Sequence, residues 1–392
     1  MLVFPARATL LALLALILPL SACTSVDAEQ TPQAAAANEI GVVEVLSGPE
    51  SCEPSASAAP AGALIFRVTN IGMDTSEFYV RRGEDNSIVT EVENIAPNLT
   101  RDLVVQLDAG TYLLTCVPTM RGEGFDSAFI MNPHANQSAA VAGVEGLRDA
   151  SEGYSKYVRA QADELLAKTE GFVDALMSGD LQAAREQYPQ ARTHWERIEP
   201  VAESFGDLDP LLDLREADLE SGQEWTGWHV LEKYLWPPDR GYRALTPKQL
   251  QRTSDGLLAN TRDLVSRIAG FTFEPFQMAN GAKELLDEVA TGKVTGEEEI
   301  WSGTDLWDFQ ANIDGAQQVF TLLTPIVSVR NPELAVELER RFSEVSGLLS
   351  QHRQGQGFRS YGELSRTQVR ELAAAVDALA EPVSRLAVTV VN

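Results

Sequence analysis

The sequence predicts two folded parts, a small all-β sandwich followed by a large all-α helical bundle. Between about residues 41 and 132, β-branched and aromatic residues form short runs separated by Gly, Asn, Asp or Pro. From about residue 153 to residue 392, apolar residues recur at the three- and four-residue spacing of helices. With 392 residues, of which 44% are hydrophobic, the chain can bury both cores.

The first 22 residues are typical of a lipoprotein signal peptide. Arg7 supplies the positive start, an apolar run over 10–20 is too short for a spanning helix, and Leu20-Ser-Ala-Cys23 resembles a lipobox. We expect export and a lipid anchor on Cys23, at the periplasmic or extracytoplasmic face of the cell membrane; an ordinary signal peptide is the alternative. Residues 23–40 are small and polar, which predicts a flexible tether.

Seven strands are predicted in the β-sandwich, which we place at 41–132. Leu103, Val105 and Leu107 alternate with residues of the opposite face, as in a half-buried strand. The segment from Asp108 to Tyr112 resembles a turn into a strand with a tyrosine corner. The predicted strands are 42–46, 63–69, 77–80, 88–92, 103–107, 112–117 and 128–131.

A linker is predicted over 133–152 and a helical domain over 153–392. Apolar residues follow helical spacing over 155–177. Thr246-Pro-Lys-Gln249 and Ser365-Arg-Thr-Gln368 have the capping-box pattern, and Asn331-Pro332 is another helix start. The pattern predicts about eight helices in a bundle.

The formal charge of −26 comes from 57 acidic and 31 basic residues. It excludes nucleic acid as a partner, because phosphate contacts need Lys and Arg. The negative charge would concentrate cations near any cleft, although a solvated acidic surface explains the same composition.

Two cysteines remain once Cys23 is assigned to the lipid. Cys52 and Cys116 form an even pair in an oxidising compartment, which favours a disulfide. A thiolate metal site with an acid such as Glu77 is the alternative. A type-1 copper site needs two His, and residues 41–132 contain none, so copper is not expected there although Met120 follows Cys116.

The segment from Trp225 to Tyr234 carries the most informative motif, H-x-x-E, formed by His229 and Glu232. On a helix these two residues share a face. Trp228 and Leu231 are among the apolar residues around them, and an apolar wall does not hold a charge without a partner. The motif therefore indicates a metal site, although a single pair of this kind also arises by chance.

Further carboxylates precede this motif. Glu196 and Glu199 are three residues apart, and Asp213 lies between them and His229. If the two helices face each other, these acids and His229 converge on one site with the nitrogen and oxygen ligands that suit iron, manganese or zinc. The alternative is a solvated acidic face. His194 cannot share the face of Glu196, so we expect it to be structural or to support a metal ligand without binding the metal.

Motifs for other chemistries are missing from the sequence. It contains no H-E-x-x-H, G-x-S-x-G, Walker A or G-x-G-x-x-G pattern. The sequence has only four His residues, so few residues could act as the general base of a hydrolytic triad. We therefore assign no catalytic residue and do not expect an enzyme.

Long motifs in one order resemble the EfeO-type iron-uptake proteins, over nearly everything after the tether. The motifs of the β-sandwich resemble that family's cupredoxin-like domain, and the motifs of the helical part resemble its imelysin-like domain. They are Cys52-Glu-Pro, 91–97 (EVENIAP), 112–116 (YLLTC), 194–200 (HWERIEP), 205–209 (FGDLD), 213–216 (DLRE), 226–233 (TGWHVLEK) and 304–312 (TDLWDFQAN).

The resemblance implies a periplasmic component that works with a membrane iron permease and a haem peroxidase-like partner. It implies metal ligation by His229 and Glu232, with Glu196, Glu199 and Asp213 as further ligands. It also implies a second site, or a disulfide, at the residues Cys52, Glu77 and Cys116.

The sequence departs from the family pattern at two positions. Leu114 stands where relatives can have Met, which weakens a soft-ligand site and favours the disulfide. Gly303 stands where relatives can have His, which argues for a structural role of Asp305 and Asp308. The peptidase name of imelysin-like domains rests on fold analogy, which does not establish an activity.

These observations together predict an iron-binding lipoprotein that captures iron and passes it to a permease. Two other functions remain open from the sequence. One is a metal-dependent enzyme, either a ferroxidase or a metallopeptidase, and the other is a protein that binds an acidic polysaccharide through a bridging metal.

Overall fold

The computed structural model describes residues 40–133, 145–219 and 221–392. The predicted signal peptide, the Cys23 anchor and nearly all of the predicted tether lie outside the described residues. None of the helices within these ranges is long and apolar enough to cross a membrane.

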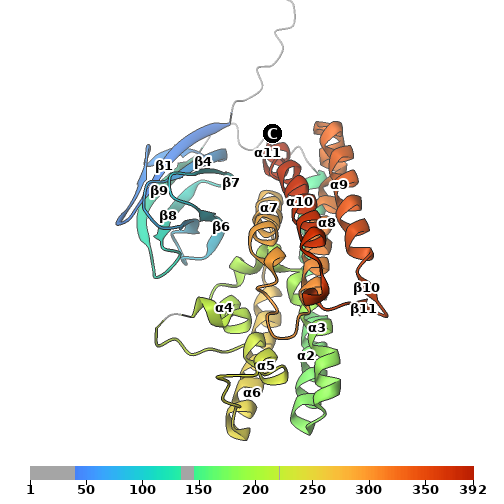
Figure 1. Ribbon diagram of the computed structural model, residues 1–392. Coiled ribbons are helices and arrows are strands. Elements are labelled where there is room, and N and C mark those ends of the chain that lie inside the picture. Colours follow the sequence, from blue (N-terminus) through green and yellow to red (C-terminus); the bar gives the residue numbers. More distant parts are fainter. Residues whose placement is uncertain (1–39, 134–144, 220) are drawn as a thin grey trace, which may run out of the picture. The chain divides into compact units, whose positions relative to one another are not determined.

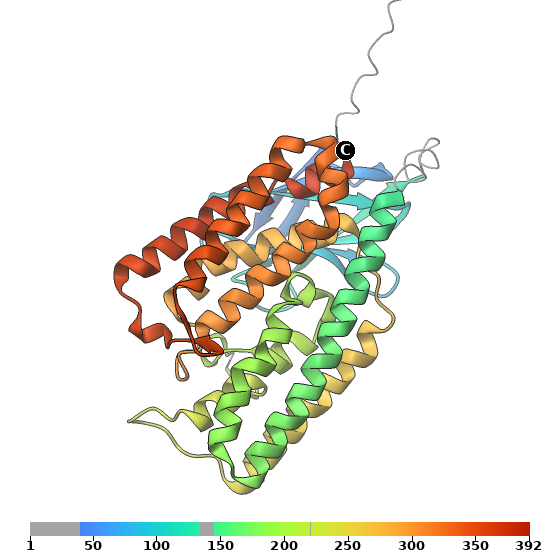
Figure 2. The ribbon, with the colours of Figure 1, turned by 90° about the vertical axis from the view of Figure 1, so that its right-hand side faces the viewer.

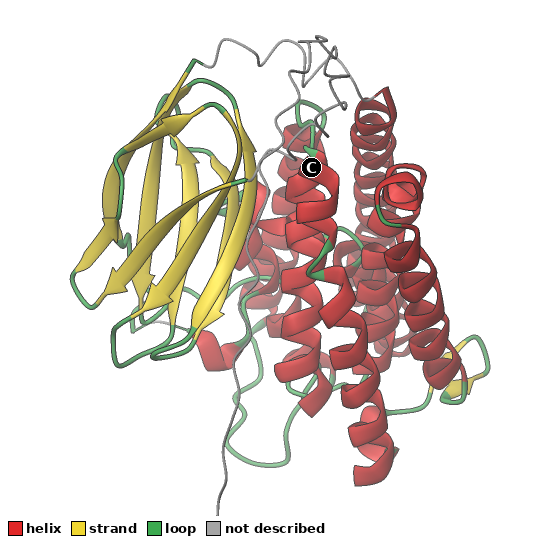
Figure 3. Ribbon diagram, turned by 90° about the horizontal axis from the view of Figure 1, so that it is seen from above, coloured by secondary structure: helices red, strands yellow, loops and turns green. Residues whose placement is uncertain are grey.

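The first part of the described chain is a sandwich of two β-sheets, seen as two yellow layers in Figure 3. One sheet has the order β2-β1-β4-β7 and the other β3-β9-β8-β5-β6. The strands are β1 (Gly41–Gly48), β2 (Ser51–Pro54), β3 (Ala58–Pro60), β4 (Gly62–Asn70), β5 (Ser76–Arg82), β6 (Ile88–Ile95), β7 (Thr100–Leu107), β8 (Gly110–Pro118) and β9 (Phe125–Asn132).

All seven predicted strands are present. The prediction missed β2 and β3, which have four and three residues and both end in Pro, so they carry little strand signal. The tyrosine corner is present as well, because the Tyr112 hydroxyl donates to the Asp108 carbonyl over 3.1 Å.

The sandwich core is closed by aromatic packing and by one covalent bond. Phe66 of one sheet packs against Phe78 and Phe129 of the other, with ring centroids 5.7 and 5.3 Å apart. A disulfide joins Cys52 of β2 to Cys116 of β8, and so links the two sheets.

The second part is helical, with long helices packed lengthwise in Figure 2. Its helices are α2 (Glu145–Ser178), α3 (Leu181–Glu196), α4 (Leu208–Asp213), α5 (Trp228–Leu235), α6 (Pro247–Ile268), α7 (Pro275–Thr291), α8 (Asp305–Arg330), α9 (Pro332–Ser350), α10 (Arg366–Val383) and α11 (Leu386–Val391). Short 3-10 helices lie at η1 (Glu199–Phe205), η2 (Glu216–Asp218), η3 (Lys293–Thr295) and η4 (Tyr361–Glu363), and a two-stranded ribbon is formed by β10 (Arg353–Gln354) and β11 (Gly357–Phe358).

The predicted helix starts agree with the structure. Thr246 and Ser365 each form a complete capping box, and the Asn331 side chain caps α9. The described residues form ten α-helices rather than about eight, because α4, α5 and α11 are short.

Helix α2 begins inside the segment predicted as a linker. It starts at Glu145, eight residues before the predicted boundary at 153. The apolar stripe of the helix extends back through Ala150, which is buried against the helical core, so the spacing continues further than the prediction allowed.

Helix α7 contacts strands β6 and β7 of the β-sandwich (Figure 1), and η1 and α11 contact the sandwich as well. The Asn280 side-chain amide donates to the Val104 carbonyl of β7 over 2.7 Å. Phe276, 3% exposed, packs into the core of the sandwich. The two parts are therefore in direct contact through buried groups.

Candidate metal centre

The H-x-x-E motif lies on the short helix α5, whose start is fixed by a glycine. Gly227 has a φ of +87°, and a Cβ at this position would lie 2.0 Å from the Leu212 carbonyl oxygen. Only glycine combines that backbone angle with that approach. The contact places the end of α4 beside the first turn of α5. Asp213, at the end of α4, therefore lies next to His229.

The imidazole of His229 is 1% exposed and is oriented through its Nδ1 atom. Glu232 Oε2 lies 3.2 Å from Nδ1. The other oxygen of Glu232 accepts hydrogen bonds from the backbone N–H groups of Trp301 and Ser302, over 2.9 and 2.8 Å. The carboxylate is therefore held in place and fixes the plane of the ring.

The opposite ring nitrogen faces two carboxylates without a hydrogen-bond partner. Nε2 of His229 lies 3.4 Å from Asp213 Oδ1 and 3.4 Å from Glu298 Oε1, and it is buried with no hydrogen bond within the described structure. Oxygens from Asp213 and Glu298 and a ring nitrogen of His229 all lie within 4.8 Å of one another, as a metal ion requires. The three residues thus form a ready set of ligands.

A second group of ligands lies on the Nδ1 side of the ring. It consists of His229, Glu232 and Glu299, again with ligand atoms within 4.8 Å of one another. Glu299 accepts hydrogen bonds from the hydroxyls of Tyr188, over 3.1 Å, and Ser302, over 2.7 Å. This side is already filled by hydrogen bonds, whereas the Nε2 side is not.

A buried arginine compensates the negative charge of the site. The Arg192 guanidinium is fully buried and forms ion pairs with five carboxylates. These belong to Glu196, Asp213, Glu298, Glu299 and Asp308. Both oxygens of Asp308 are buried without a hydrogen bond in the described structure, so the compensation is incomplete.

Glu196 and Glu199 lie beside the ligand groups and are already paired. Lys293 is buried and forms ion pairs with both, over 3.0 and 2.6 Å. The amide of Asn312 donates to both carboxylates, over 3.0 and 2.5 Å. Of the five ligands predicted from sequence, the structure therefore brings Asp213, Glu232 and His229 into the possible metal groups and leaves Glu196 and Glu199 outside them.

The charges around His229 favour a cation at the ring. Burial and the Arg192 charge act to lower the pKa of His229, but Glu232, Glu298 and Asp213 outweigh them and raise it to about 9. Burial raises the pKa of Asp213, and Arg192 and His229 offset part of that increase. With its pKa raised in this way, His229 carries a proton at neutral pH, and a metal ion bound at Nε2 would take the place of that proton.

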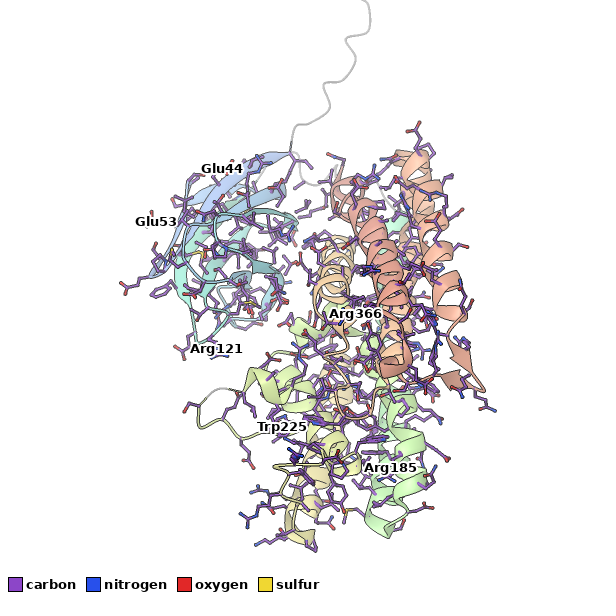
Figure 4. The ribbon with its side chains drawn as sticks, in the orientation of Figure 1. Glu44, Glu53, Arg121, Arg185, Trp225 and Arg366 are labelled. Carbon is purple, nitrogen blue, oxygen red and sulfur yellow. A yellow bond between two sulfur atoms is a disulfide. The ribbon has the colours of Figure 1, made fainter. Side chains whose placement is uncertain are left out.

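Aromatic side chains and long basic side chains enclose helix α5. Trp228 is fully buried between Phe172 and Tyr188. Figure 4 labels Trp225, whose indole N–H donates to the Leu214 carbonyl over 2.7 Å, and Arg185, whose guanidinium donates to the Leu235 carbonyl at the end of α5. These contacts hold both ends of α5 and keep His229 in position.

His194 is in none of the possible metal groups of the described residues and has a partner of its own. Its Nδ1 atom lies 2.8 Å from Gln161 Oε1. Burial and the nearby Arg197 charge lower the pKa of His194 to about 4. The ring is therefore neutral in the folded protein at neutral pH.

Cys116 and Glu77 lie on opposite faces of one sheet. Cys116 pairs directly with Phe78, so its side chain points into the sandwich core, where it is bonded to Cys52. Glu77 points to the other face and accepts a hydrogen bond from Tyr79. In this structure the three side chains do not converge.

Sequence reasoning missed the acidic and basic residues that complete the site. Glu298 and Glu299 lie in a run of three glutamates, 297–299, which has neither helical nor strand periodicity and so gives no signal of a site. Arg192 lies four residues before Glu196 on one helix face, a spacing that signals an ion pair. That spacing could have identified Arg192 in advance.

Comparisons with known proteins identify the family of the chain. Residues 150–386 match the imelysin family model, Peptidase_M75. The chain is 35% identical over 364 residues to the iron uptake system component EfeO of Yersinia pestis, which covers 90% of this chain and 92% of that protein. The chain belongs to the EfeO family.

Other EfeO proteins are similar to the same extent. The protein of Yersinia pseudotuberculosis serotype I is 36% identical over 357 residues, and that of Escherichia coli O1:K1 is 35% identical over 354 residues. They cover 90% and 89% of this chain, and each is matched over 92% of its own length. The likeness to the EfeO family therefore spans both the β-sandwich and the helical part.

Proposed function

We propose that this EfeO-family protein is exported and binds iron at His229 for delivery to a membrane permease. The observation that carries the proposal is the buried Nε2 atom of His229. It has no hydrogen-bond partner in the described structure and lies 3.4 Å from oxygens of Asp213 and Glu298. A buried polar atom without a partner is costly, and a metal ion bound to all three residues would remove that cost.

The proposed ligands are His229 through Nε2, Asp213 and Glu298. Metal-binding His residues commonly donate their other ring N–H to a carboxylate, which orients the ring. Glu232 is placed for this role at Nδ1, over 3.2 Å. The group that includes Glu299 is the alternative, in which Glu232 is itself a ligand.

Glu196 and Glu199 have a supporting role in this proposal. Their carboxylates neutralise Lys293, and Glu196 also pairs with Arg192. They influence the charge of the site without touching the metal.

Iron is the proposed cargo because of the ligands and the relatives. One imidazole and two carboxylates form a nitrogen and oxygen site that suits iron, with zinc and manganese as competitors. The similar proteins of Yersinia and Escherichia coli are iron uptake system components. We assign no catalytic residue to the site.

The resemblance supplies the proposed partners and location. They are a membrane iron permease and a haem peroxidase-like protein, with the chain tethered by lipid on Cys23. The disulfide between Cys52 and Cys116 supports export, because such bonds persist in oxidising compartments.

The test is iron binding to the purified chain, measured by equilibrium dialysis and metal analysis. His229→Ala, Asp213→Asn and Glu298→Gln should each weaken iron binding strongly, while circular dichroism shows that the helices remain. Glu297→Gln is the matched control, since Glu297 adjoins Glu298 but is 48% exposed and pairs with Arg215. Unchanged affinity in the His229 and Glu298 variants would refute the site.

A further inference from the structure

A second acidic cluster lies where the β-sandwich meets the helical part. It consists of Glu91 and Glu93 on β6 and Glu203 on η1. One oxygen from each carboxylate lies within 4.8 Å of the others. Glu91 and Glu93 are two residues apart on a strand and so share a face, which turns both toward Glu203.

One carboxylate oxygen of the cluster is buried and has no hydrogen-bond partner among the described residues. Glu91 is 8% exposed, and its Oε2 atom is buried without a hydrogen-bond partner in the described structure. Within the described ranges, no basic side chain forms an ion pair with Glu91, Glu93 or Glu203. Buried carboxylates this close repel one another unless a proton or a cation lies between them.

The pKa values of the cluster also reflect negative charge that no basic group among the described residues compensates. Burial raises the pKa of Glu91 well above its usual range, and the charge of Glu203 adds to the increase. Burial also raises the pKa of Glu203, with Asp209 as the next contribution. None of the largest contributions to either pKa comes from a basic group.

The cluster opens into a cavity that it shares with the His229 site. The cavity has a volume of about 230 Å³ and is lined by Glu91, Glu93 and Glu203 as well as by Asp213 and Glu298. One water molecule needs only roughly 15 Å³ of such volume, so a hydrated ion fits. Among its described lining residues, ten are acidic and one, Arg215, is basic.

We propose that Glu91, Glu93 and Glu203 form a second cation site, which binds a hard multivalent metal ion through oxygen atoms alone. Carboxylates without nitrogen or sulfur select hard ions over soft ones. An ion bound here also joins the β-sandwich to the helical part, because its ligands come from both. The site does not depend on the function proposed for His229, although an ion leaving it is already in the cavity that reaches Asp213 and Glu298.

Terbium(III) is a suitable probe, since it is trivalent and prefers oxygen ligands. Equilibrium dialysis of the purified metal-free chain should give two bound terbium ions per molecule. Glu91→Gln with Glu203→Gln should leave one, and so should Asp213→Asn with Glu298→Gln. Glu339→Gln with Glu363→Gln changes two exposed acids and should leave both ions.

The outcomes separate this proposal from the function proposed above. Two ions in the Glu91 and Glu203 double variant would overturn the second site, whatever happens at His229. If the Glu91 and Glu203 double variant loses one ion and the Asp213 and Glu298 double variant loses none, the second site is supported. The same result would refute Asp213 and Glu298 as metal ligands beside His229. The single variant Glu93→Gln changes a half-buried residue, and it should weaken the second site at least tenfold if the double variant fails to fold.

Discussion

Glu232 Oε2 lies 3.2 Å from Nδ1 of His229, on the ring edge opposite the two carboxylates that the Nε2 atom faces. In the proposed site, this relationship makes His229 the ligand and Glu232 the residue that orients it. It also yields a test that a simple count of metal ligands would not suggest.

Glu232→Gln should reduce iron affinity by about 10- to 100-fold while leaving one iron bound per site at saturation, because the ring loses its orientation and keeps its ligand atom. His229→Ala should remove measurable iron binding at the His229 site. Titration with metal analysis distinguishes the two. Equal loss in both variants would mean that Glu232 is a ligand, as the motif alone suggests.

Gly227→Ala should destabilise the protein by several kcal/mol, on the order of the larger single-residue effects. Its Cβ would overlap the Leu212 carbonyl, which is 2.0 Å away, and the shift would separate Asp213 from His229. Gly222→Ala is the control, because Gly222 has a φ of +91° but open space around it. It should cost only about 1 kcal/mol, from backbone strain. Thermal unfolding of both variants, followed by iron titration, checks the prediction.

Arg192→Met should destabilise the metal-free protein by about 3–5 kcal/mol, because it leaves several buried carboxylates without a counterion. The same change should strengthen metal binding, since the guanidinium shares the oxygens of Asp213 and Glu298. Melting with and without iron measures both effects. Arg340→Met removes an exposed ion pair with Glu344 and should cost at most about 1 kcal/mol. A variant with weaker iron binding would contradict the predicted competition.

His194→Gln should flatten the pH dependence of stability between about pH 4 and pH 6.5. The pKa of His194 is lowered to about 4 in the folded chain, against an ordinary value of about 6.5 in the unfolded chain. Between these values the unfolded chain binds a proton that the folded chain does not, so stability falls as the pH falls. Urea unfolding at several pH values gives the two curves. Parallel curves through this range would show that His194 does not titrate as described.

Thiol titration of the unfolded chain should find no free thiol at Cys52 and Cys116 until a reductant is added. Cys23→Ser provides the suitable background, because these two cysteines are then the only ones left. Replacing both by Ser should cost about 2–5 kcal/mol in the β-sandwich. Iron binding at His229 should not change. Two reactive thiols before reduction would exclude the disulfide.

The elements of the fold were largely predictable because local signals specify them. Capping boxes at Thr246 and Ser365, and β-branched runs between turn residues, act over a few positions of the chain. The strands β2 and β3 were missed because four and three residues carry too little periodicity. The start of α2 was placed late because Gly and Ser residues within it obscure the apolar stripe.

The candidate site was predictable only in part. The H-x-x-E spacing identified His229 and Glu232, since a helix brings residues three apart onto one face. Glu298 comes from a segment nearly seventy residues away in sequence, and only tertiary packing brings it to the ring, at 3.4 Å. Lys293 was missed for the same reason, because only tertiary packing brings it to the site. It forms ion pairs with Glu196 and Glu199, the two predicted ligands that lie outside the possible metal groups.

The buried Arg192 has a consequence for the stability of the metal-free protein. Small zinc domains depend on their metal to fold, so they cannot release it and remain intact. Here an internal guanidinium offsets part of the negative charge of the carboxylates without a metal ion. In the function proposed above, the chain would fold before it meets a metal and would release the metal without unfolding. A protein that carries iron in this way needs a stable metal-free state as much as tight binding.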